Sequence, residues 1–281
     1  MNFTFDKELA MRSAIRTLFL ALALAACASP ANAADKQAPA PSDIDAIIKR
    51  MESSGAFDAA IDRGIERHIR RQVEARKKQQ DEQQRRQAEA VRNARAVDIN
   101  RDRVFGNPQA EVSVIVYNDL ECPFCKRFAG TPERAIAKFD GKANMVFRHY
   151  PLDFHGEIAK RGAYYAECVG RQAGSKAFFA FVNDWFRLTI SNGKGLERGD
   201  AQIREIAQSA GAKDLAALDA CAKDPAVAQL VQDDIVDGTR GGITGTPGVI
   251  VRNNRTGLSL SVTGAVPAQQ VEQAIEKALK G

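Results

Sequence analysis

The stretch Glu121-Cys122-Pro123-Phe124-Cys125-Lys126 decides the fold of this chain. It follows the run Val112-Ser113-Val114-Ile115-Val116-Tyr117, whose β-branched and apolar residues predict a buried strand. After it, residues 127–139 predict a helix that closes near Gly141. Pro123 suits the first helical position, because its fixed φ fits there and its missing N–H costs nothing. The two cysteines therefore stand where a strand passes into a helix.

This position predicts different chemistry for the two thiols. Cys122 is expected at or just before the N-cap, where free backbone N–H groups and the helix dipole favour a thiolate. Cys125 follows on the same helix face, roughly 5–6 Å away, a separation that suits a disulfide. We expect a reversible redox pair, with Cys122 as an exposed nucleophile and Cys125 as the resolving thiol.

Two other interpretations of the C-x-x-C motif stay open at this point. A structural zinc site needs four ligands, but there is one C-x-x-C, and His68, His149 and His155 are not clustered in ligand spacing. A static structural disulfide is the second alternative. We expect no metal and no cofactor.

Length and charge exclude some classes of function. The chain has 281 residues and 44% hydrophobic content, enough for one core plus extensions. The net charge is +5, and it comes mainly from residues 62–95, which contain eleven Lys and Arg against six Asp and Glu. Aromatic side chains are almost absent from that segment, so it lacks a stacking platform for nucleic acid. We interpret it as a solvated helix and expect no nucleic-acid partner.

The first 33 residues have the pattern of a secretory signal peptide. Two positive charges in residues 11–16 precede an apolar run, Leu18 to Ala26, that is too short to span a bilayer. Ala31-Asn32-Ala33 then offers a signal-peptidase site. Residues 24–27 also resemble a lipoprotein box in which Cys27 would be lipidated. Both interpretations export the chain and predict a periplasmic protein, in a compartment where disulfides persist.

The remaining sequence divides into three parts. Residues 34–43 predict a linker, residues 44–98 a helical extension, and residues 99–281 a catalytic domain with a helical insert at about 156–240. The extension carries apolar residues at a spacing of four, namely Phe57, Ile61, Ile65, Ile69 and Val73. Such a stripe needs a partner, and we expect it to make the chain a homo-oligomer.

The predicted order of elements within residues 99–281 is β-α-β, a helical insert, then β-β-α. Four motifs accompany it: residues 105–108 (Phe-Gly-Asn-Pro), residues 119–125, residues 149–152 (His-Tyr-Pro-Leu) and residues 245–247 (Gly-Thr-Pro). With these motifs the chain resembles the DsbA-like thiol–disulfide oxidoreductases, over about residues 100 to 281. The resemblance implies an α/β fold of the thioredoxin type with an inserted all-helical subdomain.

The resemblance also assigns roles to further residues. It implies a cis peptide bond at Thr246–Pro247, packed against the C-x-x-C, with Thr246 free to pair with an extended substrate. Pro123 and Phe124 would contact the substrate and tune the redox couple. Relatives often place a buried acid six residues before the nucleophile, whereas this chain has Val116 there.

Several charged residues near the motif need an interpretation. Glu121 adjoins Cys122 and is expected to oppose the thiolate, with Lys126 and Arg127 offsetting it. We therefore expect a couple that is less oxidising than the strongest members of the family. Asp119 is interpreted as a loop cap in preference to a proton-transfer group, and we assign His149 and His155 no catalytic role.

The cysteines Cys168 and Cys221 lie in the predicted insert. Export favours a structural disulfide between them, which would stabilise the fold by roughly 2–4 kcal/mol. Two separate buried thiols are the alternative.

These observations predict an exported thiol–disulfide oxidoreductase of the oxidase type, which acts on unfolded or cysteine-containing exported proteins and exchanges electrons with a membrane redox partner. The stripe in the extension keeps an oligomeric isomerase or reductase open. A non-catalytic envelope adaptor with a structural C-x-x-C is the third hypothesis.

Overall fold

A computed structural model describes residues 41–281, and the predicted signal peptide, with Cys27, lies outside them. By its internal contacts the chain divides into two units, one ending at Val73 and the other beginning at Glu74. No helix within residues 41–281 is long and apolar enough to cross a membrane.

The extension forms two helices, α2 (Pro41–Ser53) and α3 (Ala56–Ala90), followed by a short 3₁₀ turn, η1 (Val91–Asn93). Helix α2 starts inside the segment predicted as a linker, because Pro41 suits the first turn of a helix. Gly55 separates α2 from α3 with a φ of 65°, a conformation that favours glycine. The predicted stripe is solvent-exposed throughout, with 44–59% of each side chain accessible, at Phe57, Ile61, Ile65, Ile69 and Val73.

The second unit is built on a five-stranded mixed sheet with the order β1-β3-β2-β4-β5. The strands are β1 (Arg103–Gly106), β2 (Val112–Asn118), β3 (Ala143–His149), β4 (Gly248–Asn253) and β5 (Ser259–Thr263). Strands β2 and β3 run parallel, and the other three pairs are antiparallel. The central strand β2 is buried along its whole length.

Alternate side chains of β2 face two different hydrophobic clusters, as the period of two requires. Val112, Val114 and Val116 belong to the larger cluster, which the insert helices and the C-terminal helix cover. Ile115 and Tyr117 belong to a smaller cluster on the other face. Both faces of the strand are therefore shielded from water, which explains why most of its residues are apolar.

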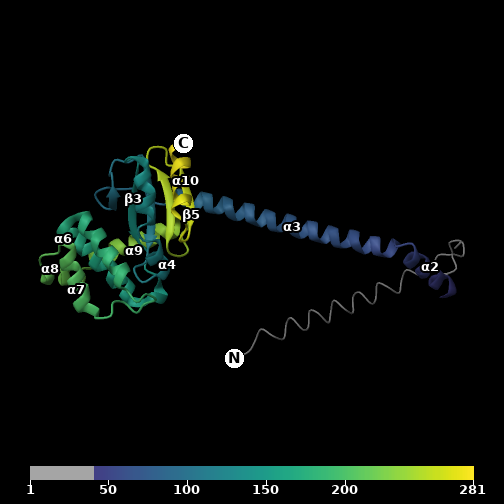
Figure 1. Ribbon diagram of the computed structural model, residues 1–281, viewed down its shortest axis with the longest axis horizontal. Coiled ribbons are helices and arrows are strands. Elements are labelled where there is room, and N and C mark those ends of the chain that lie inside the picture. Colours follow the sequence, from purple (N-terminus) through teal and green to yellow (C-terminus); the bar gives the residue numbers. More distant parts are fainter. Residues whose placement is uncertain (1–40) are drawn as a thin grey trace, which may run out of the picture. The chain divides into compact units, whose positions relative to one another are not determined.

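The helices of the second unit follow the predicted order (Figure 1). They are α4 (Pro123–Phe128), α5 (Thr131–Ile136), α6 (Gly156–Leu188), α7 (Gly199–Ala210), α8 (Leu215–Cys221), α9 (Pro225–Arg240) and α10 (Ala268–Leu279), with 3₁₀ turns η2 (Ala137–Phe139) and η3 (Asp153–His155). Helices α6 to α9 form the insert between β3 and β4. The fold is thus thioredoxin-like with a helical insert, as predicted.

One helix prediction needs correction. The single helix expected over residues 127–139 is broken at Gly130, whose φ of 75° is left-handed, and Pro132 restarts the chain as α5. Within α6, Gly174 has non-helical backbone angles (φ 83°, ψ 177°) and divides the element into two helical segments.

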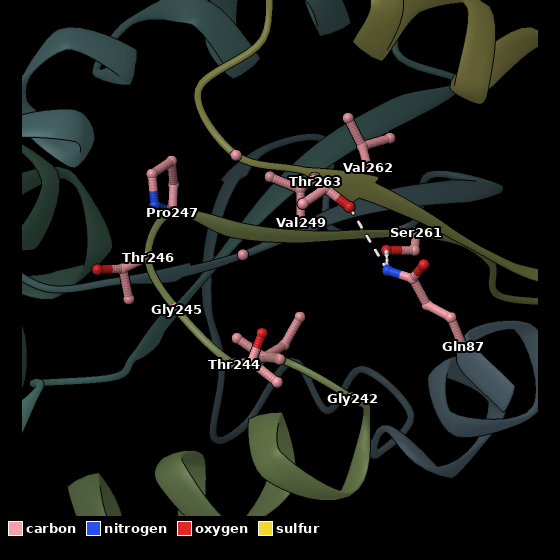
Figure 2. A pocket seen from close by; sticks show the side chains of 13 residues that line it. Gln87, Gly242, Thr244, Gly245, Thr246, Pro247, Val249, Ser261, Val262 and Thr263 are labelled. Atoms are coloured by element: carbon pink, nitrogen blue, oxygen red, sulfur yellow. Dashed lines mark hydrogen bonds between the residues drawn. The ribbon is translucent and has the colours of Figure 1, made fainter. Parts of the chain in front are cut away.

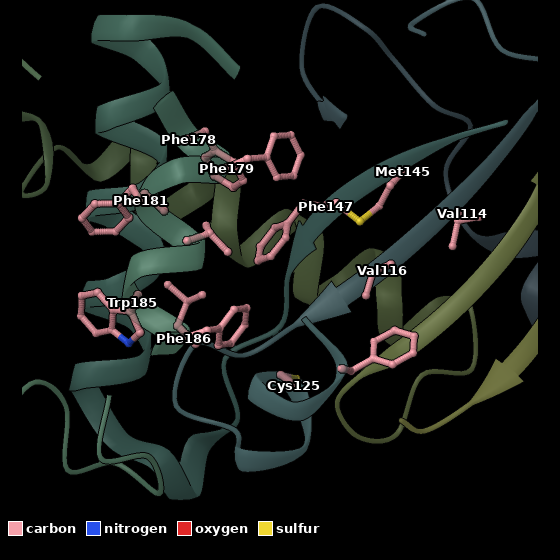
Figure 3. Close-up of a cluster of buried hydrophobic side chains, with 14 of the residues drawn as sticks. Val114, Val116, Cys125, Met145, Phe147, Phe178, Phe179, Phe181, Trp185 and Phe186 are labelled. Atoms are coloured by element: carbon pink, nitrogen blue, oxygen red, sulfur yellow. The ribbon is translucent and has the colours of Figure 1, made fainter. Parts of the chain in front are cut away.

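Aromatic side chains of α6 fill the space between the insert and the sheet (Figure 3). Trp185, Phe178 and Phe181 are fully buried. Phe178 packs edge-on against Phe147 of β3, with ring centroids 5.2 Å apart. This cluster also includes Cys125, so the redox motif rests on the same core that joins insert and sheet.

A buried charge cluster holds the segment before β1 against the sheet and α9. The guanidinium of Arg148 is fully buried and pairs with Asp102 at 3.0 Å and Asp237 at 2.7 Å. Burial alone would raise the pKa of Asp102, but the hydrogen bond and charge of Arg148 outweigh it and hold that pKa below its usual value. Asp234, also buried, pairs with Arg95 at 3.2 Å.

Candidate active site

The redox motif stands at the carboxyl end of β2, at the start of α4. Cys122 is the N-cap residue, with extended backbone angles (φ −79°, ψ 121°), and Pro123 follows at the first helical position. This is the placement that the sequence predicts. Two free backbone N–H groups of the first helical turn, those of Phe124 and Cys125, are directed toward the Cys122 sulfur and lower its pKa.

Cys122 and Cys125 are both free thiols in this structure. Hydrogen bonding from the Cys125 thiol is the largest influence on Cys122 and lowers the pKa of Cys122 to about 6, although burial opposes this shift. Burial, followed by the hydrogen bond to Cys122, raises the pKa of Cys125 well above its ordinary value. At neutral pH the pair therefore combines a Cys122 thiolate with a Cys125 thiol.

The expectation of an exposed nucleophile is wrong for this state of the molecule. Only 3% of Cys122 and 1% of Cys125 is solvent-accessible. The reason is the loop before β4, which lies against Cys122: when it is protonated, the Cys122 thiol donates to the carbonyl oxygen of Thr246 at 3.4 Å. An incoming sulfur must therefore pass this loop to reach Cys122.

The Thr246–Pro247 peptide bond is cis, as the resemblance implied. The C-x-x-C motif and the Thr246–Pro247 turn, more than a hundred residues apart in the sequence, thus meet at the sulfur atom of Cys122. Phe124, in contrast, projects outward, with 53% of its surface accessible. The Arg127 guanidinium lies over its ring, 4.3 Å from the centroid. Phe124 and the Thr246 loop are the parts of the site that an approaching protein can touch.

The carboxylate of Glu121 is bound by the insert and is not among the main influences on the pKa of Cys122. This carboxylate is fully buried and accepts three hydrogen bonds, from Trp185 Nε1 (3.0 Å), Thr189 Oγ1 (2.7 Å) and the backbone N–H of Gly195 (2.9 Å). All three donors belong to α6 and the loop after it. Glu121 therefore connects the redox motif to the insert, a structural role that its position next to Cys122 does not reveal.

The cations of α4 are likewise engaged away from the sulfur. Lys126 donates from Nζ to the carbonyl oxygen of Thr189 at 2.7 Å, and Arg127 stacks on Phe124. The predicted opposition by Glu121 and its compensation by Lys126 and Arg127 are thus not among the main influences on the pKa of Cys122.

Asp119 caps the loop between β2 and α4, in agreement with its interpretation as a loop cap. Its Oδ1 accepts from the backbone N–H of Glu121 at 2.7 Å, and its Oδ2 accepts from that of Leu152 at 2.8 Å. His155 Nδ1 lies 2.6 Å from the same Oδ2. This contact could not be predicted from the sequence, since His155 follows β3 and only the parallel pairing of β2 and β3 brings the two loops together.

In the insert, a disulfide joins Cys168 of α6 to Cys221 of α8. Within residues 41–281 no cluster of three or more His, Cys, Asp or Glu side chains is arranged to hold a metal ion.

Comparisons with known proteins agree with this geometry. The sequence model of the family described as Thioredoxin matches residues 98–277. DsbA2 of Pseudomonas aeruginosa is 31% identical, with a TM-score of 0.56, and the match covers 65% of this chain and 96% of that protein. BdbD of Bacillus subtilis, 22% identical with a TM-score of 0.56 over 67% of this chain and 98% of the other, shares the fold.

Curated relatives match over a shorter stretch. The Na(+)/H(+) antiporter NhaA 1 of Mycolicibacterium gilvum is 30% identical over 119 residues, which are 39% of this chain and 19% of the antiporter. The chain thus spans about a fifth of the length of these relatives. By its family match and by its likeness to DsbA2, the chain belongs to the thioredoxin family, as a DsbA-like thiol–disulfide oxidoreductase.

Proposed function

We propose that this chain is an exported oxidase that introduces disulfides into cysteine-containing proteins through Cys122 and Cys125. The observation that carries the proposal is the unequal pair: the pKa of Cys122 is lowered to about 6, while that of Cys125 is raised. A thiolate that is stable at neutral pH is a good leaving group and favours the reduced form of the protein, so the oxidised form is an electron acceptor.

The reaction begins from the Cys122–Cys125 disulfide. A substrate thiolate attacks Cys122 Sγ, the intramolecular S–S bond breaks, and the electron pair goes to Cys125 Sγ, which takes up a proton. A second substrate thiolate then attacks the substrate sulfur of the mixed disulfide and releases Cys122 as its thiolate. The substrate gains a disulfide and the protein is left as the dithiol, so turnover needs an oxidant, for which we propose a membrane redox partner.

The substrate would bind at Phe124, Pro123 and the Thr246–Pro247 turn. Two further exposed apolar side chains lie on loops that contact the motif: Phe154, 78% accessible, and Ile190, 54% accessible. Phe154 precedes His155, the partner of Asp119, and Ile190 follows Thr189, the partner of Glu121. An unfolded chain with exposed apolar residues would find a matching surface here.

The signal peptide proposed for residues 1–33 would deliver the chain to the periplasm. The mass of the mature N-terminus after cell fractionation would distinguish cleavage before Ala34 from lipidation of Cys27. The exposed stripe on α3 favours one second candidate, an oligomeric isomerase or reductase, which would work in the reduced form.

Refolding of reduced ribonuclease with a glutathione buffer tests the proposal. The mature chain should accelerate recovery of ribonuclease activity, Cys122→Ser should abolish the effect, and Cys125→Ser should accumulate mixed disulfides with substrate. Loss of adducts in Cys125→Ser together with their appearance in Cys122→Ser would reverse the two roles. An inactive mature chain would favour the adaptor hypothesis.

A further inference from the structure

The last turns of α3 lie beside the loop that carries the cis-proline. Val91, directly after α3, is buried in the same small cluster as Ile243 of that loop. A Cβ atom on Gly242 would lie 2.9 Å from the Cβ of Ala90, closer than carbon atoms approach. The chain therefore needs glycine at this position for the extension to pack against the loop.

One turn before Ala90, a single side chain reaches from the extension to the edge of the sheet. Gln87 donates from Nε2 to Ser261 Oγ at 3.0 Å and is 3.4 Å from Thr263 Oγ1 (Figure 2). Ser261 and Thr263 are two residues apart on β5 and so share one face of the strand. Because β5 is the last strand of the sheet, the side of it away from β4 is unpaired within the sheet.

These groups enclose a pocket of about 230 Å³. One wall is the loop from Gly242 to Gly248, the other is residues 261–264, and Gln87 closes the pocket on the side of the extension (Figure 2). Thr246 belongs both to this pocket and to the redox site, since its carbonyl oxygen is the acceptor for Cys122. An extended substrate peptide that passes Thr246 next to Cys122 would continue directly into the pocket.

The lining is uncharged and mixed in character: the apolar side chains of Ile243, Pro247, Val249 and Val262 lie beside Thr and Ser hydroxyls, backbone groups and the Gln87 amide. We propose that this pocket holds a residue next to the reacting cysteine of an extended peptide substrate, and that Gln87 determines the preference for uncharged residues there. This inference rests on the proposed function. Gln87 lies outside residues 98–277, the part that matches the family, so the extension adds this element to the site.

The test measures single-turnover rates of mixed-disulfide formation between the oxidised full-length mature protein and a panel of single-cysteine peptides. Each position flanking the cysteine carries Ser, Lys or Glu in turn. For Gln87→Glu, the ratio of the Lys-peptide rate to the Glu-peptide rate should rise about two- to five-fold at one flanking position, the range expected for a solvent-accessible ion pair. Gln87→Lys should shift the same ratio in the opposite direction, and high salt should diminish both shifts.

Gln84→Glu, which adds the same charge to an exposed position three residues earlier on α3, is the matched control and should leave the ratio within experimental error of the unmodified chain. Equal shifts in Gln84→Glu and Gln87→Glu, or no shift at any flanking position in both Gln87 variants, would overturn the role of Gln87. If the unmodified chain forms no mixed disulfide with any peptide, the proposed function itself fails.

Discussion

Trp185 donates a hydrogen bond of 3.0 Å from its indole nitrogen to the carboxylate of Glu121. The donor is at the end of a long insert helix, and the acceptor is the residue immediately before the reactive cysteine. Both side chains are fully buried. The insert thereby helps to hold the backbone of the redox motif in place, in addition to covering the sheet.

Glu121→Ala should destabilise the protein by about 2–4 kcal/mol, because it leaves the buried donors of Trp185, Thr189 and Gly195 without an acceptor. Urea unfolding measures this loss. Glu157→Ala, which removes a carboxylate whose side chain is 85% accessible, should change stability little.

The Glu121→Ala variant also tests whether Glu121 acts electrostatically on Cys122 in addition to its structural role. Since its carboxylate is held by the insert, Glu121→Ala should leave the ionisation midpoint of Cys122 nearly unchanged. A clear fall in that midpoint would show that the negative charge opposes the thiolate after all.

The reactivity of Cys122 should follow its lowered pKa. Alkylation of the reduced protein by iodoacetamide should rise with pH around a midpoint of about 6, the pKa of Cys122. The hydrogen bond from the Cys125 thiol is the main cause, so Cys125→Ala should raise the midpoint, whereas Cys125→Ser, which keeps a donor, should raise it less. A midpoint near the ordinary cysteine value of 9.0 in the unmodified protein would contradict this account.

The depressed pKa also has a stability consequence. A thiol that ionises more easily when folded stabilises the reduced protein above its unfolded pKa, and this stabilisation is lost as the pH falls through about 6. Relative to Cys122→Ala, the reduced protein should therefore become more stable as the pH rises from 6 toward 9.

Features that depend on neighbouring residues could be predicted from the sequence, whereas contacts between distant segments could not. The β2 strand, the N-cap position of Cys122 and the helix start at Pro123 are local features, and each could be predicted. The break at Gly130 could not be located, since glycine is compatible with a helix until its φ is known. The burial of Cys122 was also missed, because it depends on a loop more than a hundred residues away.

Charged residues near the motif were the least predictable part of the site. Next to Cys122 in the sequence, Glu121 suggests electrostatic opposition, but its side chain points to the insert. His155 and Asp119 meet only through the pairing of β2 and β3. Sequence proximity indicates which charges are near in the chain, whereas the pKa depends on which atoms face the sulfur.

Asp234 should make stability depend on pH in the opposite sense to Cys122. Burial raises the pKa of Asp234 to about 6, and the charge and backbone N–H of His149, followed by the charges of Arg95 and Arg148, only partly oppose it. A carboxyl group whose pKa is raised on folding stabilises the protein below its unfolded pKa of about 4, and this contribution is lost as the pH rises through 6.

The stability of the unmodified protein minus that of Asp234→Asn should therefore fall by on the order of 2–3 kcal/mol between pH 4 and pH 7. Asp233→Asn, at the neighbouring position with a side chain 45% accessible, is the control for loss of one charge. Parallel stability curves for the unmodified protein and Asp234→Asn would refute the prediction.

The disulfide between Cys168 and Cys221 should persist when mild dithiothreitol reduces the Cys122–Cys125 pair. Cys168 is fully buried, so a reductant reaches its sulfur only after the contact between α6 and α8 opens. Mass spectrometry after differential alkylation would detect it, and labelling of all four cysteines at the same dithiothreitol concentration would contradict the prediction.

The extension should make the mature protein oligomeric. The stripe on α3 exposes roughly half of each of its apolar side chains, at Phe57, Ile61, Ile65, Ile69 and Val73. Complete burial of such a side chain is worth about 1.5–3 kcal/mol before ordering costs, so two or more copies can gain enough by packing their stripes together. A spacing of four exceeds 3.6 residues per turn and does not favour a long left-handed coiled coil, which points to a short helical bundle.

Light scattering on the mature chain decides the point, with Ile65→Asp as the disrupting variant. A buried carboxylate would cost more than the lost side chain contributes, so Ile65→Asp should be monomeric at concentrations at which the unmodified chain is not. Ala60→Asp introduces the same charge about 140° away around the helix and should remain oligomeric. Because an oligomer would support the isomerase over the oxidase, a monomer in all three proteins would remove the main support for that alternative.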